Sequence, residues 1–145
     1  MATASEIRVP VWFWIVSGVA LLWEAMGCYS YLMEVSMNSA RIAALPEAER
    51  TLMQSTPAWL YAVFAVAVWV GLLGAVSLLM RRAWARSLFI VSLVAVLIQF
   101  GWWFLVQKAA SVLGRSAYGL PALIVVVAVL LVWFSGVATK RGWLR

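Results

Sequence analysis

One carboxyl group, that of Glu24, is the feature of this sequence that could do chemistry inside a membrane, because it lies within a long apolar block. An ionisable side chain in a membrane-spanning segment is costly, so it usually faces the interior of a helix bundle and indicates function. Counted from the same side of the membrane at 1.5 Å per residue, Glu24 lies ~20 Å deep and Gln99 ~18 Å. The sequence therefore predicts a hydrogen bond between the Glu24 carboxyl and the Gln99 amide.

Two interpretations of this pair remain open. In the first, Glu24 binds and releases a proton that is coupled to the movement of a solute. In the second, the carboxyl and the amide tie two helices together, a contribution of about 0.5–2 kcal/mol in a membrane. The second is favoured, because the apolar blocks hold no other charged side chain.

A wider candidate site surrounds the pair. On a helical wheel, one face of the first block carries Ser17, Glu24, Cys28 and Tyr31, and Gln99 shares its face with Trp103. The candidate intramembrane polar site comprises Glu24, Gln99, Ser17, Cys28, Tyr31 and Trp103. The opposite face of the first block is expected to meet lipid through Ile15, Val19 and Leu22.

The residue types that are missing exclude several classes of enzyme. The sequence has no His and no Asp, which excludes a Ser-His-Asp triad, a histidine-ligated haem and a His-based metal site. No glycine-rich phosphate loop ends in Lys-Ser or Lys-Thr. The other carboxylates are expected to be solvated loop charges; they are Glu6, Glu34, Glu47 and Glu49. We therefore expect a non-enzyme without a cofactor or metal.

Four apolar blocks must position these groups. They run roughly over 11–32, 57–80, 88–106 and 120–138. Each meets or approaches the length of about 20 apolar residues that a helix needs to span a bilayer. Hydrophobic residues make up 66% of the chain and charged residues only 11%. The sequence therefore predicts an all-α fold: one integral-membrane domain over residues 1–145, forming a transmembrane four-helix bundle in a lipid bilayer.

The Lys and Arg residues predict how the bundle is threaded. One side carries seven, Arg8, Arg81, Arg82, Arg86, Lys140, Arg141 and Arg145, against the single acid Glu6. The other side carries Arg41, Arg50, Lys108 and Arg115, diluted by Glu34, Glu47 and Glu49. The positive-inside rule then places both termini in the cytoplasm. This pattern accounts for the net charge of +6 without a nucleic-acid partner. In the outer connection 33–56, a short amphipathic helix is expected to follow Pro46 and lie on the membrane surface.

Small and aromatic residues complete the expected packing. The second block carries a stripe of small residues that lets helix backbones approach closely, made up of Ala67, Gly71, Gly74 and Ala75. Packing within the bundle is a better explanation for this stripe than a dimer face. Trp143 and other tryptophans near the block ends are expected to be interface anchors.

Several tryptophan-containing blocks carry a resemblance over nearly the whole chain. They include Trp12-Phe13-Trp14-Ile15-Val16, Leu22-Trp23-Glu24-Ala25-Met26-Gly27, Ala67-Val68-Trp69-Val70-Gly71, Arg81-Arg82-Ala83-Trp84-Ala85 and Lys140-Arg141-Gly142-Trp143-Leu144. The chain resembles a family of short bacterial inner-membrane proteins that are often labelled sugar transporters. The resemblance implies a four-span protein of the bacterial inner membrane, and often Asn at the position of Glu24. An amide there could not titrate, which weakens an obligatory proton-carrier role.

The functional expectation is accordingly a non-enzymatic accessory or structural helix bundle, with a possible homo-oligomer or membrane-protein partner. The alternative is a small solute transporter for a sugar or a drug-like molecule, proton-coupled through Glu24 and acting as an oligomer. Few polar side chains in the blocks could bind sugar hydroxyls, which counts against the sugar label.

Overall fold

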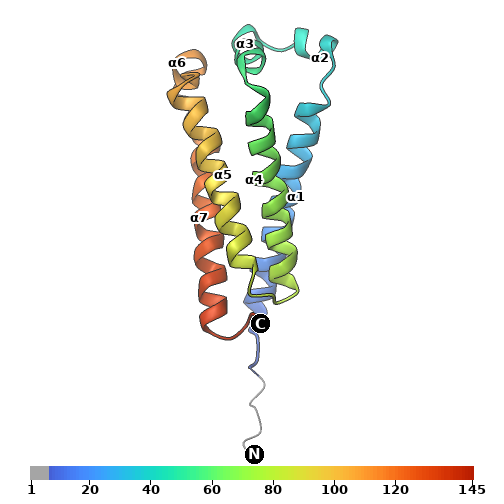
Figure 1. Ribbon diagram of the computed structural model, residues 1–145, viewed down its shortest axis with the longest axis vertical. Coiled ribbons are helices and arrows are strands. Elements are labelled where there is room, and N and C mark those ends of the chain that lie inside the picture. Colours follow the sequence, from blue (N-terminus) through green and yellow to red (C-terminus); the bar gives the residue numbers. More distant parts are fainter. Residues whose placement is uncertain (1–6) are drawn as a thin grey trace, which may run out of the picture.

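Four long helices run along the length of the protein in the computed structural model, which describes residues 7–145 (Figure 1). They are α1 (Val11–Val35), α4 (Ala58–Leu79), α5 (Ala85–Leu105) and α7 (Gly119–Lys140). Each is long and apolar enough to cross a membrane, α7 together with the short turn before it. The described residues contain no strand, so the prediction of an all-helical chain with four membrane-length helices is confirmed.

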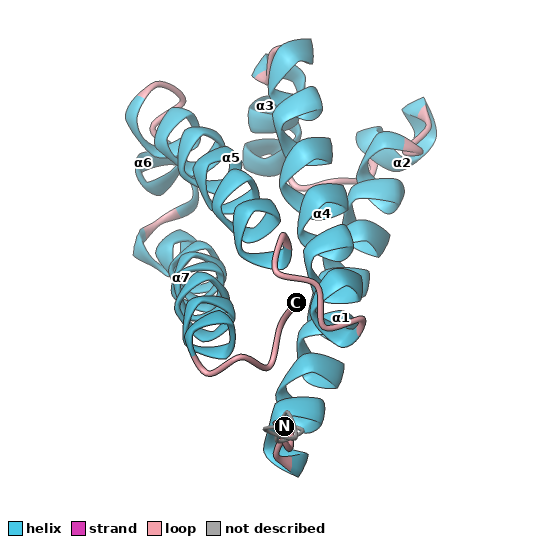
Figure 2. Cartoon of the chain, turned by 60° about the horizontal axis from the view of Figure 1, so that its bottom comes forward, coloured by secondary structure: helices cyan, strands magenta, loops and turns pink. Residues whose placement is uncertain are grey.

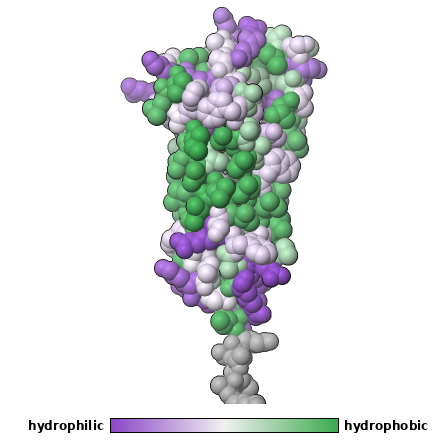
Figure 3. Space-filling model, viewed as in Figure 1, coloured by the Kyte–Doolittle hydropathy of each residue, from purple (hydrophilic) through white to green (hydrophobic). Residues whose placement is uncertain are grey.

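The distribution of apolar and polar residues on the surface also fits a bundle of membrane-length helices. Figure 3 shows an apolar band around the middle of the visible face, with polar residues gathered at both ends. On α1, the side chains of Ile15, Val19 and Leu22 are exposed, whereas Ser17 and Glu24 are buried. The expected division of this helix into an outward side and a bundle side is therefore confirmed.

The order of the helices in the bundle follows from their packing. α4 packs against both α1 and α5, and α5 also packs against α7 (Figure 2). The α4–α5 connection is short because Arg81 adopts the left-handed conformation, with φ 58°. The Arg82 amide then donates to the Ser77 carbonyl at 2.8 Å, which ends α4 with a tight reversal. This turn makes α4 and α5 antiparallel neighbours.

Aromatic rings join α1 and α7 at the end of the bundle near the chain termini, which we call the closed end. Phe13 of α1 is fully buried and stacks on Phe134 of α7, with ring centroids 5.8 Å apart. Trp143, in the tail after α7, packs edge-on against Phe13 at 5.8 Å. The tail returns to the α4–α5 turn, where the Arg145 amide donates to the Arg81 carbonyl at 2.7 Å.

This contact corrects the expectation for Trp143. The side chain is only 5% exposed, so it belongs to the core and is not an interface anchor. The reason is the reversal at Gly142, whose φ of 73° turns the tail under the bundle. Glu6, which entered the charge count for this end, lies outside the described residues.

Short helices gather at the opposite end, which we call the open end (Figure 1). They are α2 (Ser39–Ala43), α3 (Glu47–Ser55), α6 (Ala109–Leu113) and the 3-10 turn η1 (Arg115–Tyr118). Gln107 joins two of these segments, because its amide nitrogen donates to the Leu52 carbonyl at 3.0 Å and to the Ser55 hydroxyl at 2.9 Å. The connection before α7 is therefore attached to the connection before α4.

Candidate functional site

A cavity of about 900 Å³ lies inside the bundle between its middle and the open end. Its lining comes from all four long helices and from α3, and includes Glu24, Gln99, Ser92, Trp23 and Trp103. Apolar packing explains why the space is left. The cluster at the closed end joins all four long helices, whereas the smaller cluster toward the open end joins α4, α5 and α7 without α1.

The cavity also reaches the apolar outer surface of the bundle. Met26 of α1 and Leu120 of α7 both line it, although their side chains are 64% and 63% exposed. The space is therefore accessible both at the open end and through the side of the bundle.

Glu24 is the one charged residue near the floor of this cavity. It is only 9% exposed, and its carboxyl lies directly against the backbone of Gly71 in α4. A Cβ atom on Gly71 would overlap the Glu24 carboxyl and would lie 3.0 Å from the Ser92 hydroxyl oxygen. Glycine at position 71 therefore makes room for the carboxyl.

The predicted pairing of Glu24 with Gln99 needs correction. Among the described residues, no hydrogen bond or ion pair joins Glu24 to any other residue, Gln99 included. The Glu24 carboxyl lies instead against Gly71 of α4, close to the Ser92 hydroxyl of α5. Glu24 and Gln99 still line the same cavity from different helices.

The other candidate residues separate into two groups. Trp103 lines the cavity, whereas Ser17, Cys28 and Tyr31 lie outside its lining. Ser17 is fully buried on the same face of α1 as Glu24, and its hydroxyl has no hydrogen-bond partner in the described chain. Cys28 donates its thiol to the Val68 carbonyl at 3.3 Å, and Tyr31 packs edge-on against Phe64 at 5.2 Å.

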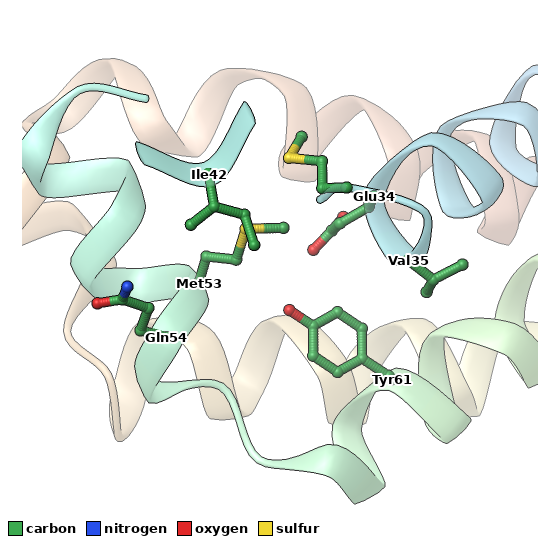
Figure 4. Close-up of a pocket in the computed structure, with 7 residues that line it drawn as sticks. Glu34, Val35, Ile42, Met53, Gln54 and Tyr61 are labelled. Carbon is green, nitrogen blue, oxygen red and sulfur yellow. The ribbon is translucent and has the colours of Figure 1, made fainter. Parts of the chain in front are cut away.

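Sequence reasoning missed two residues, Glu34 and Tyr61, that line the cavity where it opens toward the open end; we call this part its mouth. Glu34 was expected to be a solvated loop charge, but α1 continues to Val35, so Glu34 is half-buried on a helix. It lines a smaller pocket of about 300 Å³ with Tyr61, and Figure 4 shows its carboxylate and the Tyr61 hydroxyl pointing into that space. Both residues also line the large cavity, so the pocket is its continuation toward the open end. The apolar residues Met33 and Val35 around Glu34 were the available signal.

The small-residue stripe of α4 serves contacts within this one chain. Ala67, Gly71, Gly74 and Ala75 are all buried in the bundle. Gly71 faces Glu24, and Gly74 lies under the Phe89 ring, whose nearest carbons would be 3.0 Å from an added Cβ. The stripe therefore brings α1 and α5 close to the α4 backbone.

The arrangement is suited to binding. It provides a concave space, one buried carboxyl and several aromatic rings. Within the described part of the chain, no group of three or more His, Cys, Asp or Glu side chains is placed to hold a metal ion. No family model matches the sequence, and neither a curated protein nor a solved structure is similar to it.

Proposed function

We propose that the protein is a non-enzymatic, multi-pass protein of the bacterial inner membrane that binds a small solute in the cavity and carries it across the bilayer. The observation that carries this proposal is the cavity of about 900 Å³ with Glu24 buried near its floor. Binding sites for small molecules are concave, mostly apolar spaces of about 300–1,000 Å³ with a few polar groups. The size and the lining of this cavity match that description.

The buried carboxyl supports transport over a purely structural role. A structural carboxyl in a membrane is expected to hydrogen-bond across helices, because an unpaired polar group there is costly. Glu24 has no such partner among the described residues and lines the cavity instead. A group of this kind can exchange a proton or contact a solute, which favours the transporter over the accessory bundle.

The proposed orientation places the open end outside the cell. Seven Lys and Arg residues lie at the closed end, counting Arg8, and four at the open end, so the positive-inside rule favours cytoplasmic termini. In this orientation α3 would lie at the outer membrane surface, with the acidic residues Glu47 and Glu49 in its first turn. The mouth beside Glu34 and Tyr61 would then face the periplasm. Reporter fusions after Met80 and after Arg145 test this orientation, since both should score cytoplasmic.

Transport is tested with purified protein reconstituted in liposomes. We expect uptake of at least one member of a panel of labelled sugars, amino acids and organic amines, driven by a proton gradient. Uptake should be lost with Glu24→Gln and retained with the matched control Glu47→Gln, because Glu47 lies outside the cavity lining. Absence of flux for the whole panel, together with co-purification of a constant membrane partner, would instead support the accessory bundle and contradict this proposal.

A further inference from the structure

The charges around the cavity are all of one sign. Its lining includes the carboxylates of Glu24, Glu34 and Glu49 and no Lys or Arg. The chain as a whole has a net charge of +6, and the connections at the open end carry Arg41, Arg50, Lys108 and Arg115. None of these four basic residues reaches the lining. A negative concave lining raises the local concentration of cations and disfavours anions.

These carboxylates have no cationic partner in the protein. No ion pair forms between the described residues, so Glu34 and Glu49 lack a Lys or Arg neighbour at salt-bridge distance. Glu24 is nine-tenths buried and has neither an ion-pair partner nor a hydrogen-bond donor in the described chain. Burial without a partner disfavours the ionised form of such a carboxyl, and a positively charged ligand would stabilise that form.

Aromatic rings supply the second feature that favours a cation. The lining contains Trp23, Tyr29, Tyr61, Phe64, Phe100 and Trp103. The faces of such rings attract cations, and quaternary ammonium groups are recognised by aromatic cages of this kind. Several hydroxyls of the lining that could bind a sugar are already engaged with backbone carbonyls: Ser92 donates to Ala67 at 2.6 Å, Thr56 to Leu52 at 2.8 Å and Ser30 to Met26 at 3.0 Å.

The spacing of the carboxylates favours an organic cation over a metal ion as the ligand. Glu24 and Glu34 are ten residues apart on α1, which places them ~15 Å apart along the helix axis. They cannot coordinate one metal ion, and no cluster of metal-ligand type occurs in the described residues. The remaining lining is mostly apolar and opens toward lipid at Met26, which suits a ligand with a large apolar body.

We propose that the cavity binds a lipophilic organic cation, with the positive charge beside Glu24 and the apolar body against the aromatic rings. Glu34 and Tyr61 form the mouth, where the ligand's charge is first attracted. This inference rests on the proposed function, because it names the chemical class of the solute that the cavity takes.

Two ions of the same shape and opposite charge test this inference. Binding of tetraphenylphosphonium and of tetraphenylborate is measured by isothermal titration calorimetry, with the full chain in phosphatidylcholine nanodiscs and empty nanodiscs as the blank. We expect saturable binding of the phosphonium that is at least about tenfold tighter than that of the borate, since like-charge juxtaposition is strongly unfavourable. Glu24→Gln should weaken phosphonium binding about tenfold, Glu34→Gln by less, and Glu47→Gln not at all.

The outcomes distinguish the two proposals. Binding of the borate as tight as that of the phosphonium, lost when Val68→Trp fills the cavity, would overturn the cation inference and leave a solute-binding cavity. Phosphonium binding unchanged by Glu24→Gln would also overturn it. If neither ion binds, while Trp fluorescence and helix content show folded protein, the cation inference fails, and uptake of the sugar and amino-acid members of the panel decides the solute-binding function separately.

Discussion

At the closed end, rings from α1, α7 and the C-terminal tail meet, whereas toward the open end the same two long helices border a cavity. Both ends are built from the same four apolar helices. The difference lies in which side chains face inward. Phe13, Phe134 and Trp143 fill the closed end, whereas toward the open end the side chains of α1, including Glu24, line the cavity. Hydropathy sets membrane location, and side-chain volume decides where the bundle closes.

The largest expected effect comes from breaking the closed end. Phe13→Ala removes a fully buried ring that contacts Trp143 and Phe134. The cost of such a truncation in soluble proteins is about 3–5 kcal/mol, and we expect about 2–3 kcal/mol here because lipid also solvates the ring. Thermal unfolding in detergent micelles measures the loss. The control Phe100→Ala, beside the cavity, should cost clearly less, and equal losses would contradict the comparison.

A methyl group beside the cavity should have the next largest effect. Gly71→Ala places a Cβ atom where the Glu24 carboxyl now lies, so α1 or the side chain must shift. Overpacking of this kind costs about 1–3 kcal/mol, and we expect the lower half of that range because the carboxyl can move into the cavity. Solute binding should also weaken. Gly101→Ala is the matched control, since nothing lies within 4 Å of its added Cβ; it should be neutral or stabilising. A neutral Gly71→Ala would show that Glu24 is not confined.

The attachment of α3 to the open end gives a smaller, local effect. Gln107→Ala removes the amide that donates to Leu52 and Ser55, at a cost of about 1 kcal/mol. Hydrogen exchange followed by mass spectrometry should show faster exchange across residues 47–56. The exposed Gln54→Ala on the same helix should leave exchange unchanged. Slow exchange in the Gln107 variant would mean that α3 is held by other contacts.

The smallest effect is expected from one interhelical hydrogen bond. Ser92→Ala removes the hydroxyl that donates from α5 to the Ala67 carbonyl of α4 at 2.6 Å. Hydrogen bonds between membrane helices contribute about 0.6 kcal/mol on average. The exposed Ser87→Ala on α5 is the control, and unfolding in micelles should separate the two by about that amount. A loss several times larger would show that Ser92 also positions Glu24.

The helices and the outward side of α1 could be predicted, because both depend on local hydropathy and a helical period. Ile15, Val19 and Leu22 face outward as expected, and Glu24 faces inward. The partner of Glu24 could not be predicted in the same way. The small residues of α4 indicated a close approach of helices, but a single sequence does not say which helices approach.

Contacts that form where the chain reverses direction could also not be predicted from hydropathy and helical periodicity. Trp143 is buried where Gly142 makes a left-handed turn and Arg145 exchanges backbone hydrogen bonds with Arg81 and Ala83 of the α4–α5 turn. The mouth beside Glu34 requires α1 to run three residues past the expected end at Leu32. Each outcome was decided by tertiary contacts that local propensity does not report.

Thiol accessibility at two positions of α4 tests the central claim, an open cavity above a closed end, most directly. Two variants are made in a Cys28→Ala background, each with a single cysteine. One carries it in place of Val68, which lines the cavity, and the other in place of Ala75, which lies in the core of the closed end. In phosphatidylcholine nanodiscs, a small water-soluble thiosulfonate should modify position 68 faster, although position 75 is nearer a helix end. Faster modification at position 75, or none at position 68, would contradict the account.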